Sequence, residues 1–343
     1  MAPTILSAPV MLVALACLCG AVIAGAVTGP VQLHAGQVVR ELAGHVPFLD
    51  ITSDLSERDA AILWQLRMPR IVLGALVGAM LSASGAAYQG VFRNPLADPY
   101  LLGAASGAAL GATLAITYGG QGSTDPIQVP LAAFAGALLG VGMAYVLGRS
   151  ARTGSRIGSL ILAGVAVASF LTAVQTYLSQ RDDETFRQVY RWILGRLATS
   201  GWREVLLILP YVAVSSVALI LHRRLLDVVS VGDEESQSLG VPTARVRLVV
   251  VAAASLGTAA AVAVSGLIGF VGIIVPHTVR LIVGSSYRLV LPLSLVFGGA
   301  FLVLADLLAR TVIAPAELPI GVVTAFFGAP FFAVVLKTGK GAA

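Results

Sequence analysis

The stretch from Leu248 to Val275 carries no charged residue and is apolar almost throughout. A transmembrane helix needs about 20 mostly apolar residues, so this stretch alone is long enough to cross a membrane. The rest of the chain is similar, because hydrophobic residues make up 57% of its 343 residues and charged residues only 11%. A soluble domain has roughly 25% charged residues. The chain is therefore expected to be a polytopic membrane protein with short loops.

The pattern of the apolar runs favours helices over an outer-membrane β-barrel. Barrel strands alternate apolar and polar residues over segments of about ten positions, whereas these runs are continuous, so the predicted fold class is all-α. Cys17 and Cys19 both lie in the first run and do not indicate a disulfide framework. The net charge of +5 is spread over the loops and does not indicate a nucleic-acid partner.

Pro, Gly and charged residues divide the apolar runs into about ten predicted membrane-spanning helices, which form one transmembrane domain over residues 1–343. The first run ends at Ala24-Gly25-Ala26, similar to a signal-peptide cleavage site. No Lys or Arg precedes it and it is longer than the usual apolar region of a signal peptide, so we expect the first helix to be retained. The predicted spans lie at 5–27, 68–86, 100–118, 127–147, 158–178, 204–221, 248–265, 267–284, 289–309 and 318–336.

An even number of spans places both termini on the same side of the membrane. The loops on that side hold only slightly more than half of the 22 Lys and Arg residues. The short loop from Arg149 to Arg156 contains three arginines, and the C-terminal tail contains Lys337 and Lys340. Basic residues close to span ends carry most weight in the positive-inside rule, so both termini are predicted to be cytoplasmic.

The sequence shows no sign of catalytic or metal chemistry. The four histidines lack metal-ligand spacing, so no metal site is predicted. The phosphate-binding pattern G-x-x-x-x-G-K-[ST] is absent, because Gly339-Lys340 lacks its other glycine. Ionisable residues are almost missing from the span interiors, apart from Asp306, Arg310 and Glu317 at the outer junction of the last two spans. An ion-coupled transporter would be expected to have such residues within its spans.

Polar interruptions with Pro and Gly occur near 89–99, 266–280 and 315–332. Broken helices in membranes are tolerated where they are buried in protein or line a cavity. The interruptions therefore indicate either simple kinks or a pathway with gates. Separately, the long inner segment 222–247 contains an acidic run and the Gly240-Val241-Pro242 turn. It is predicted to be either a solvated loop or a pair of short surface helices that dock a soluble partner.

Glycine rows at four-residue spacing indicate how the helices pack. Such rows allow two helix backbones to approach closely where lipid provides no hydrophobic driving force. They are therefore predicted to be structural. The rows are Gly74 and Gly78; Gly103, Gly107 and Gly111; and Gly136 and Gly140.

Four strings in this order and spacing closely resemble the permease family of type II ATP-binding-cassette (ABC) importers for cobalamin, ferric siderophores and haem. They are RMPR at 67–70, QGVFRNPLADPYLLGAASGA at 89–108, GLIGFVGIIVPHTVR at 266–280 and APAELPIGVVTAFFGAPFF at 314–332. The resemblance covers essentially the whole chain from Arg67 to Phe332. It implies a homodimer of ten-helix subunits in the bacterial inner membrane. Two ATPase subunits, which hold ATP and magnesium, would dock on the cytoplasmic face, and a periplasmic substrate-binding protein on the outer face.

The resemblance also gives roles to particular residues. Arg67, Arg70 and Arg310 match outer-face arginines that meet carboxylates of the binding protein. Asn94 and Leu96 match the cytoplasmic gate, and the fifth span would line the pathway with polar residues that share much of one helical face. The pathway residues are Ser169, Thr172, Gln175 and Thr176. The coupling region that receives the ATPase movement would include Leu226, Asp233, Glu234, Leu239, Gly240 and Val241.

One departure from the family pattern bears on the substrate. After Trp192-Ile193-Leu194-Gly195 the family has a small polar residue, whereas this chain has Arg196, which follows Arg187 and Arg191. Arginine pairs with carboxylates, so these residues either guide a substrate such as haem or form part of a solvated loop. The expected function is a non-enzymatic subunit that imports haem or a ferric siderophore. A cobalamin importer and an ion-coupled secondary transporter are the alternatives, and this chain is expected to bind no cofactor itself.

Overall fold

The computed structural model describes residues 8–29, 31–45, 51–119, 127–150, 156–197 and 201–338. Arg152 and Lys340, which contribute to the predicted orientation, lie outside the described residues. Within these ranges the chain is helical and contains no β-strand, as predicted. Each predicted span coincides with one helix. These helices are α1 (Ala8–Val27), α4 (Met68–Phe92), α5 (Ala104–Tyr118), α6 (Gln128–Ser150), α7 (Arg156–Ser179), α9 (Arg203–Val231), α11 (Thr243–Ser265), α12 (Val271–Val283), α13 (Tyr287–Thr311) and α14 (Ile320–Thr338).

The helices differ in length more than the sequence predicts. Seven helices in the described ranges, counting the continuous helix Glu57–Phe92 as one, are long and apolar enough to cross a membrane. Helices α5 and α12 have only 15 and 13 residues. A helix rises about 1.5 Å per residue, so neither covers the roughly 30 Å of a bilayer core. Irregular chain precedes both, with a left-handed backbone at Gly103 and Phe270.

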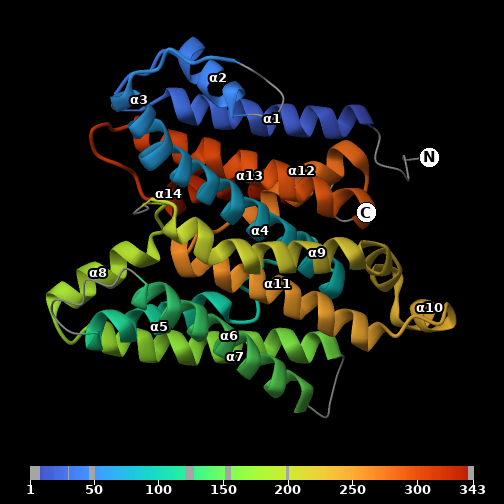
Figure 1. The fold of residues 1–343 in the computed structure, drawn as a ribbon. Coiled ribbons are helices and arrows are strands. Elements are labelled where there is room, and N and C mark those ends of the chain that lie inside the picture. The colour runs from blue at the N-terminus through green and yellow to red at the C-terminus, as the bar shows by residue number, and fades with distance from the viewer. Residues whose placement is uncertain are drawn as a thin grey trace.

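Helix α4 lies at the centre of the bundle. It packs against α9, α11, α12 and α13, and Figure 1 shows it running between the layer of α1 and α13 and the layer of α9 and α11. The predicted glycine rows mark close helix crossings. Gly78 of α4 faces the backbone of Gly298 of α13, and Gly107 of α5 faces Gly136 of α6, with no space for a Cβ in either crossing.

The long connections contain helices that the sequence reading did not assign. The outer segment before α4 forms α2 (Ala35–Gly44), α3 (Glu57–Ala61) and the π-helix η1 (Ile62–Arg67). The outer segment 179–203 contains α8 (Asp183–Ile193), whose N-cap Asp182 accepts a hydrogen bond from Thr185 N at 2.7 Å. This helix is amphipathic, with Val189 and Trp192 buried and charged residues on the opposite face.

The segment 222–247 corrects the prediction of two short helices. Helix α9 continues to Val231, beyond the predicted end at 221, because charged residues outside the apolar layer are compatible with a continuing helix. Only α10 (Asp233–Ser238) is short. It is followed by a turn with Gly240 at φ +73°, and α11 begins at Thr243.

Candidate functional site

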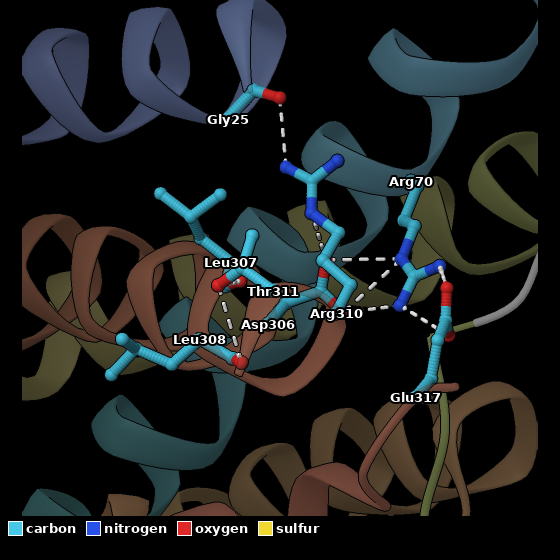
Figure 2. Close-up of polar contacts among 8 residues, drawn as sticks. All are labelled: Gly25, Arg70, Asp306, Leu307, Leu308, Arg310, Thr311 and Glu317. Atoms are coloured by element: carbon cyan, nitrogen blue, oxygen red, sulfur yellow. Dashed lines mark hydrogen bonds and ion pairs between the residues drawn. The ribbon is translucent and has the colours of Figure 1, made fainter. Parts of the chain in front are cut away.

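Arg70 is the centre of a charged cluster at the start of α4 and the end of α13. Its Nε and Nη2 donate to the Asp306 carboxylate at 3.0 and 2.8 Å, and its Nη1 donates to Glu317 Oε1 at 2.8 Å. Figure 2 shows Arg70 between the two carboxylates. Asp306 is almost fully buried, whereas the Glu317 side chain is 50% exposed. The hydrogen bonds from Arg70 hold the pKa of Glu317 below its usual value.

Arg310 and Arg67 connect this region to the end of α1. Arg310 Nη2 donates to Gly25 O at 2.7 Å, as Figure 2 shows, and its Nε lies 3.7 Å from Asp306. Arg67 Nη1 donates to Val27 O at 2.8 Å. The two arginines are only 9% and 6% exposed. Their guanidinium groups bind internal partners in this conformation, and the role of these arginines in meeting carboxylates of a binding protein stays a prediction.

Helix α8 presents a cationic and aromatic face beside this end of the bundle. Arg187 and Arg191 lie one turn apart and are both exposed, and within the described ranges their side chains make no hydrogen bond or ion pair. The rings of Phe186 and Tyr190, also exposed, stack with centroids 6.1 Å apart and planes 10° apart. Arg196 follows the helix with an exposed side chain, and its backbone N donates to Ser265 O at 2.7 Å. These arginines are therefore accessible, as substrate guidance requires.

An apolar cavity of about 520 Å³ adjoins the end of α8. Leu194, Phe270 and Phe326 are among its lining residues. Leu194 follows the end of α8, Phe270 lies in the irregular segment before α12, and Phe326 lies in the first turns of α14. The broken chain at 266–270 thus lines a cavity, where non-helical backbone is tolerated in membranes. Its interpretation as part of a pathway with gates stays a prediction.

Helix α7 exposes three of the four predicted pathway residues. Ser169, Thr172 and Thr176 are exposed and follow i, i+3, i+7 spacing on one face. Gln175 does not share this face, because it is 8% exposed and its Nε2 donates to Ser179 Oγ at 2.9 Å. An offset of one residue turns the side chain about 100° around the helix, so Gln175 lies off the exposed face, and the pathway role of all four residues stays a prediction.

The predicted gate residues lie in the turn after α4, at the opposite end of the bundle. Asn94 Oδ1 accepts a hydrogen bond from Leu96 N at 2.9 Å, so the Asn94 side chain shapes its own turn. Both residues are exposed. Asn94 also lines a cavity of about 760 Å³ between the ends of α4, α9 and α12, whereas Leu96 does not. Their role as a gate stays a prediction.

Asp233, the first residue of α10, joins the gate turn to the predicted coupling region. It accepts hydrogen bonds from Arg247 of α11, at 3.0 Å through Nη1, and from Arg93 Nη2. Arg93 is the left-handed residue at the end of α4, and its Nε also donates to Val229 O at 3.2 Å. The hydrogen bond from Arg247 lowers the pKa of the Asp233 carboxyl group. The first residue of α10 is therefore hydrogen-bonded to the residue next to Asn94.

Most of the predicted coupling residues lie on an exposed surface. Glu234, Leu239 and Gly240 are exposed, and Leu239 is 70% exposed although it is apolar. Val241 is half-buried. Leu226 is the exception, because it is fully buried against Gly90. Leu226 therefore does not form part of the exposed surface of this region, and its assignment to the coupling region stays a prediction.

Sequence reasoning missed the residues that pair with the charged side chains at both ends of the bundle. Asp306 was recognised beside Arg310 and Glu317, but not its pairing with Arg70. Arg93, Arg247 and Asp227 had no assigned role. Asp227 Oδ2 accepts from Ser286 Oγ at 2.9 Å and so holds the start of α13. The available signal was the presence of isolated charges beside apolar runs, since such charges are normally paired.

Comparison with known proteins gives one consistent assignment. The sequence matches the FecCD transport family over residues 12–338. It is 43% identical to the cobalamin import system permease of Halobacterium salinarum over 282 residues, which is 82% of this chain and 74% of that protein. It is 39% identical to the hemin transport system permease of Yersinia pestis over 278 residues, 79% of this chain and 81% of that protein. A solved metal-chelate type ABC transporter in an inward-facing conformation has a similar fold, with a TM-score of 0.84 and 28% identity, covering 97% of this chain and 100% of the other.

Proposed function

This chain belongs to the FecCD transport family, and from that membership we propose that it is the membrane-spanning subunit of a type II ABC importer. Its substrate would be an iron compound, haem or a ferric siderophore, carried from the periplasm to the cytoplasm across the bacterial inner membrane. The chain would not hydrolyse ATP. A separate ATPase, which holds ATP and magnesium, would do so, and two copies of this chain would form the pathway between them.

The observation that carries this proposal is the position of Asp233. It lies at the start of the short helix α10 and is bound by Arg93, next to the gate turn, and by Arg247. The exposed residues Glu234 and Leu239 supply the polar and apolar contacts that a docked ATPase would use. Movement of α10 would then be transmitted through a charged hydrogen-bond network to Asn94 and Leu96. In the proposed orientation of the chain in the membrane, α10 and both termini face the cytoplasm.

The outer cluster is the proposed landing surface for a periplasmic binding protein. Arg70 and Glu317 are its more exposed members, because Arg67 and Arg310 are buried. Docking through Arg67 or Arg310 would require these arginines to leave their contacts with α1. Their main effect in the present conformation is to hold α1, α4 and α13 together beneath the landing surface. Exposed ion pairs with a partner would affect orientation and association rate more than affinity.

The face of α8 supports haem as the substrate. Haem is a flat apolar ring with two carboxylates. The stacked Phe186 and Tyr190 rings offer a surface for the ring, and Arg187 and Arg191 offer partners for the carboxylates. An apolar cavity adjoins the end of the same helix. Cobalamin remains the alternative within the same family.

Substrate identity is tested by competition in proteoliposomes that contain this chain, its ATPase and its binding protein. ATP-dependent uptake of haem is expected to persist in the presence of excess cobalamin. If excess cobalamin abolishes haem uptake and cobalamin itself accumulates, the substrate is cobalamin and not haem. Absorbance titration of the isolated binding protein with haem, cobalamin and a ferric siderophore provides an independent readout.

A further inference from the structure

A cationic cavity of about 580 Å³ lies between the ends of four helices on the side that carries α10. Its polar residues include Arg149 at the end of α6 and Arg245 and Arg247 in the first turns of α11. Among the described residues that line it there is no Asp or Glu. Apolar side chains form the rest of the wall, including Phe92, Leu160 and Val251.

The arginines of this cavity have unused hydrogen-bonding capacity. Within the described ranges, the exposed side chains of Arg149 and Arg245 make no hydrogen bond or ion pair. Arg247 binds Asp233 through Nη1 and Nη2, but its Nε is buried and has no partner. Its side chain is only 13% exposed. Arg247 therefore contributes positive charge to the wall, whereas Arg149 and Arg245 offer the accessible donors.

Two helix N-termini reinforce the positive potential. The first turn of α7 supplies Ile157 and Leu160 to the wall, and the first turn of α11 supplies Ala244 and Arg245. The N-terminal end of a helix favours negative charge. Their convergence with three arginines therefore selects an anion.

The surroundings identify what kind of anion. The cavity lies at the ends of membrane-spanning helices, and Leu248 on its wall is 45% exposed. Val146 and Leu147, next to Arg149 on α6, are also exposed apolar residues. A free inorganic anion would make no favourable contact with this apolar wall. Basic pockets between transmembrane helices typically bind the headgroups of anionic lipids.

We propose that this cavity binds an anionic phospholipid, with its phosphate between Arg149 and Arg245 and its acyl chains along Leu160 and Leu248. Arg247 lines the same cavity and binds Asp233 with its terminal nitrogens. The lipid site is thus joined to the start of α10 by one side chain. This inference does not depend on which substrate the protein transports.

The test measures lipid retention by the full-length chain. The protein is reconstituted in vesicles of equal amounts of phosphatidylglycerol and phosphatidylcholine, extracted in detergent, and examined by native mass spectrometry. The wild-type chain is expected to retain phosphatidylglycerol preferentially. Each of Arg149→Gln and Arg245→Gln should reduce that preference about fivefold, the effect of roughly one basic residue near a membrane surface. Both side chains are exposed and unpaired, so unchanged thermal unfolding is expected for these variants.

Arg224→Gln is the matched control, because Arg224 is an exposed arginine on the same side that does not line the cavity. It should leave the preference unchanged. Excess inorganic phosphate should not displace the lipid, because phosphate lacks acyl chains. Displacement by phosphate would indicate a simple anion site. Equal retention of the two lipids by the wild-type chain, or an undiminished preference in the Arg149→Gln/Arg245→Gln double variant, would also overturn the proposal.

Discussion

Arg70 and Asp306 are 236 positions apart in the sequence, yet two nitrogens of Arg70 donate to the Asp306 carboxylate at 3.0 and 2.8 Å. This pair fixes the outer end of α4 against α13. Arg310 and Arg67 extend the connection to α1. The outer surface on which a binding protein is proposed to dock is therefore held by internal ion pairs.

Arg70→Ala is predicted to destabilise the chain by about 3 kcal/mol, because loss of one partner leaves the buried Asp306 carboxylate without its main counter-ion. Thermal unfolding in detergent measures the change. Asp306→Ala in the Arg70→Ala background should recover part of the loss, since no unpaired carboxylate then remains. If the double variant is as unstable as the sum of the single variants, the two side chains are energetically independent and the pairing account is wrong.

The Glu317 interaction with Arg70 predicts a defined pH dependence. Because the pKa of Glu317 is lowered in the folded chain, its contribution is complete above the ordinary carboxyl pKa of about 4 and is lost as pH falls through the lowered value. The difference in Tm between the wild-type chain and Glu317→Gln should therefore be constant from about pH 8 to about pH 5. It should shrink below about pH 4. A difference that disappears near neutral pH would contradict the lowered pKa.

Close helix packing is tested by two glycines of α6. A methyl group at Gly136 meets the backbone of Gly107, whereas nothing lies within 4 Å of a Cβ at Gly142. Gly136→Ala is predicted to destabilise the chain by about 1–3 kcal/mol through overpacking. Gly142→Ala should be neutral or slightly stabilising, because alanine favours helix over glycine. Equal effects of the two substitutions would show that the α5–α6 crossing is not tight.

The α8 face predicts a substrate-selective transport defect. Arg187→Glu combined with Arg191→Glu should reduce ATP-dependent haem uptake at least about tenfold, because two attractive charges become repulsive toward the propionates. Arg58→Glu, an exposed outer-face change on α3, provides the control and should have little effect. Normal haem uptake by the α8 variant would show that α8 is not part of the transport path.

The sequence was sufficient to locate the spans because continuous apolar runs report directly on burial in lipid. It did not predict α8, since this helix buries only one stripe and its charged face resembles a solvated loop. It also ended α9 at 221, where charge begins, although the helix continues to Val231. Hydropathy marks the edge of the membrane and not the end of a helix.

The sequence predicted which residues are functional better than it predicted which residues they bind. The family resemblance singled out Arg67, Arg70 and Arg310, and the structure places them at one end of the bundle. Their burial depends on contacts with Gly25, Val27 and Asp306, which come from distant parts of the chain. Such pairings depend on how α1, α4 and α13 cross, and local sequence patterns carry no information about these crossings. The same reason explains why Asp233 was assigned to coupling without its link to Arg93.

The most direct test of the central claim is substrate uptake by proteoliposomes that contain this chain, its ATPase and its binding protein. Haem or a ferric siderophore should accumulate only when ATP and all three components are present. Asp233→Ala, which removes the link between α10 and Arg93, should greatly reduce uptake while ATP hydrolysis continues. Uptake by this chain alone, driven by an ion gradient without ATP, would contradict the account and identify a secondary transporter.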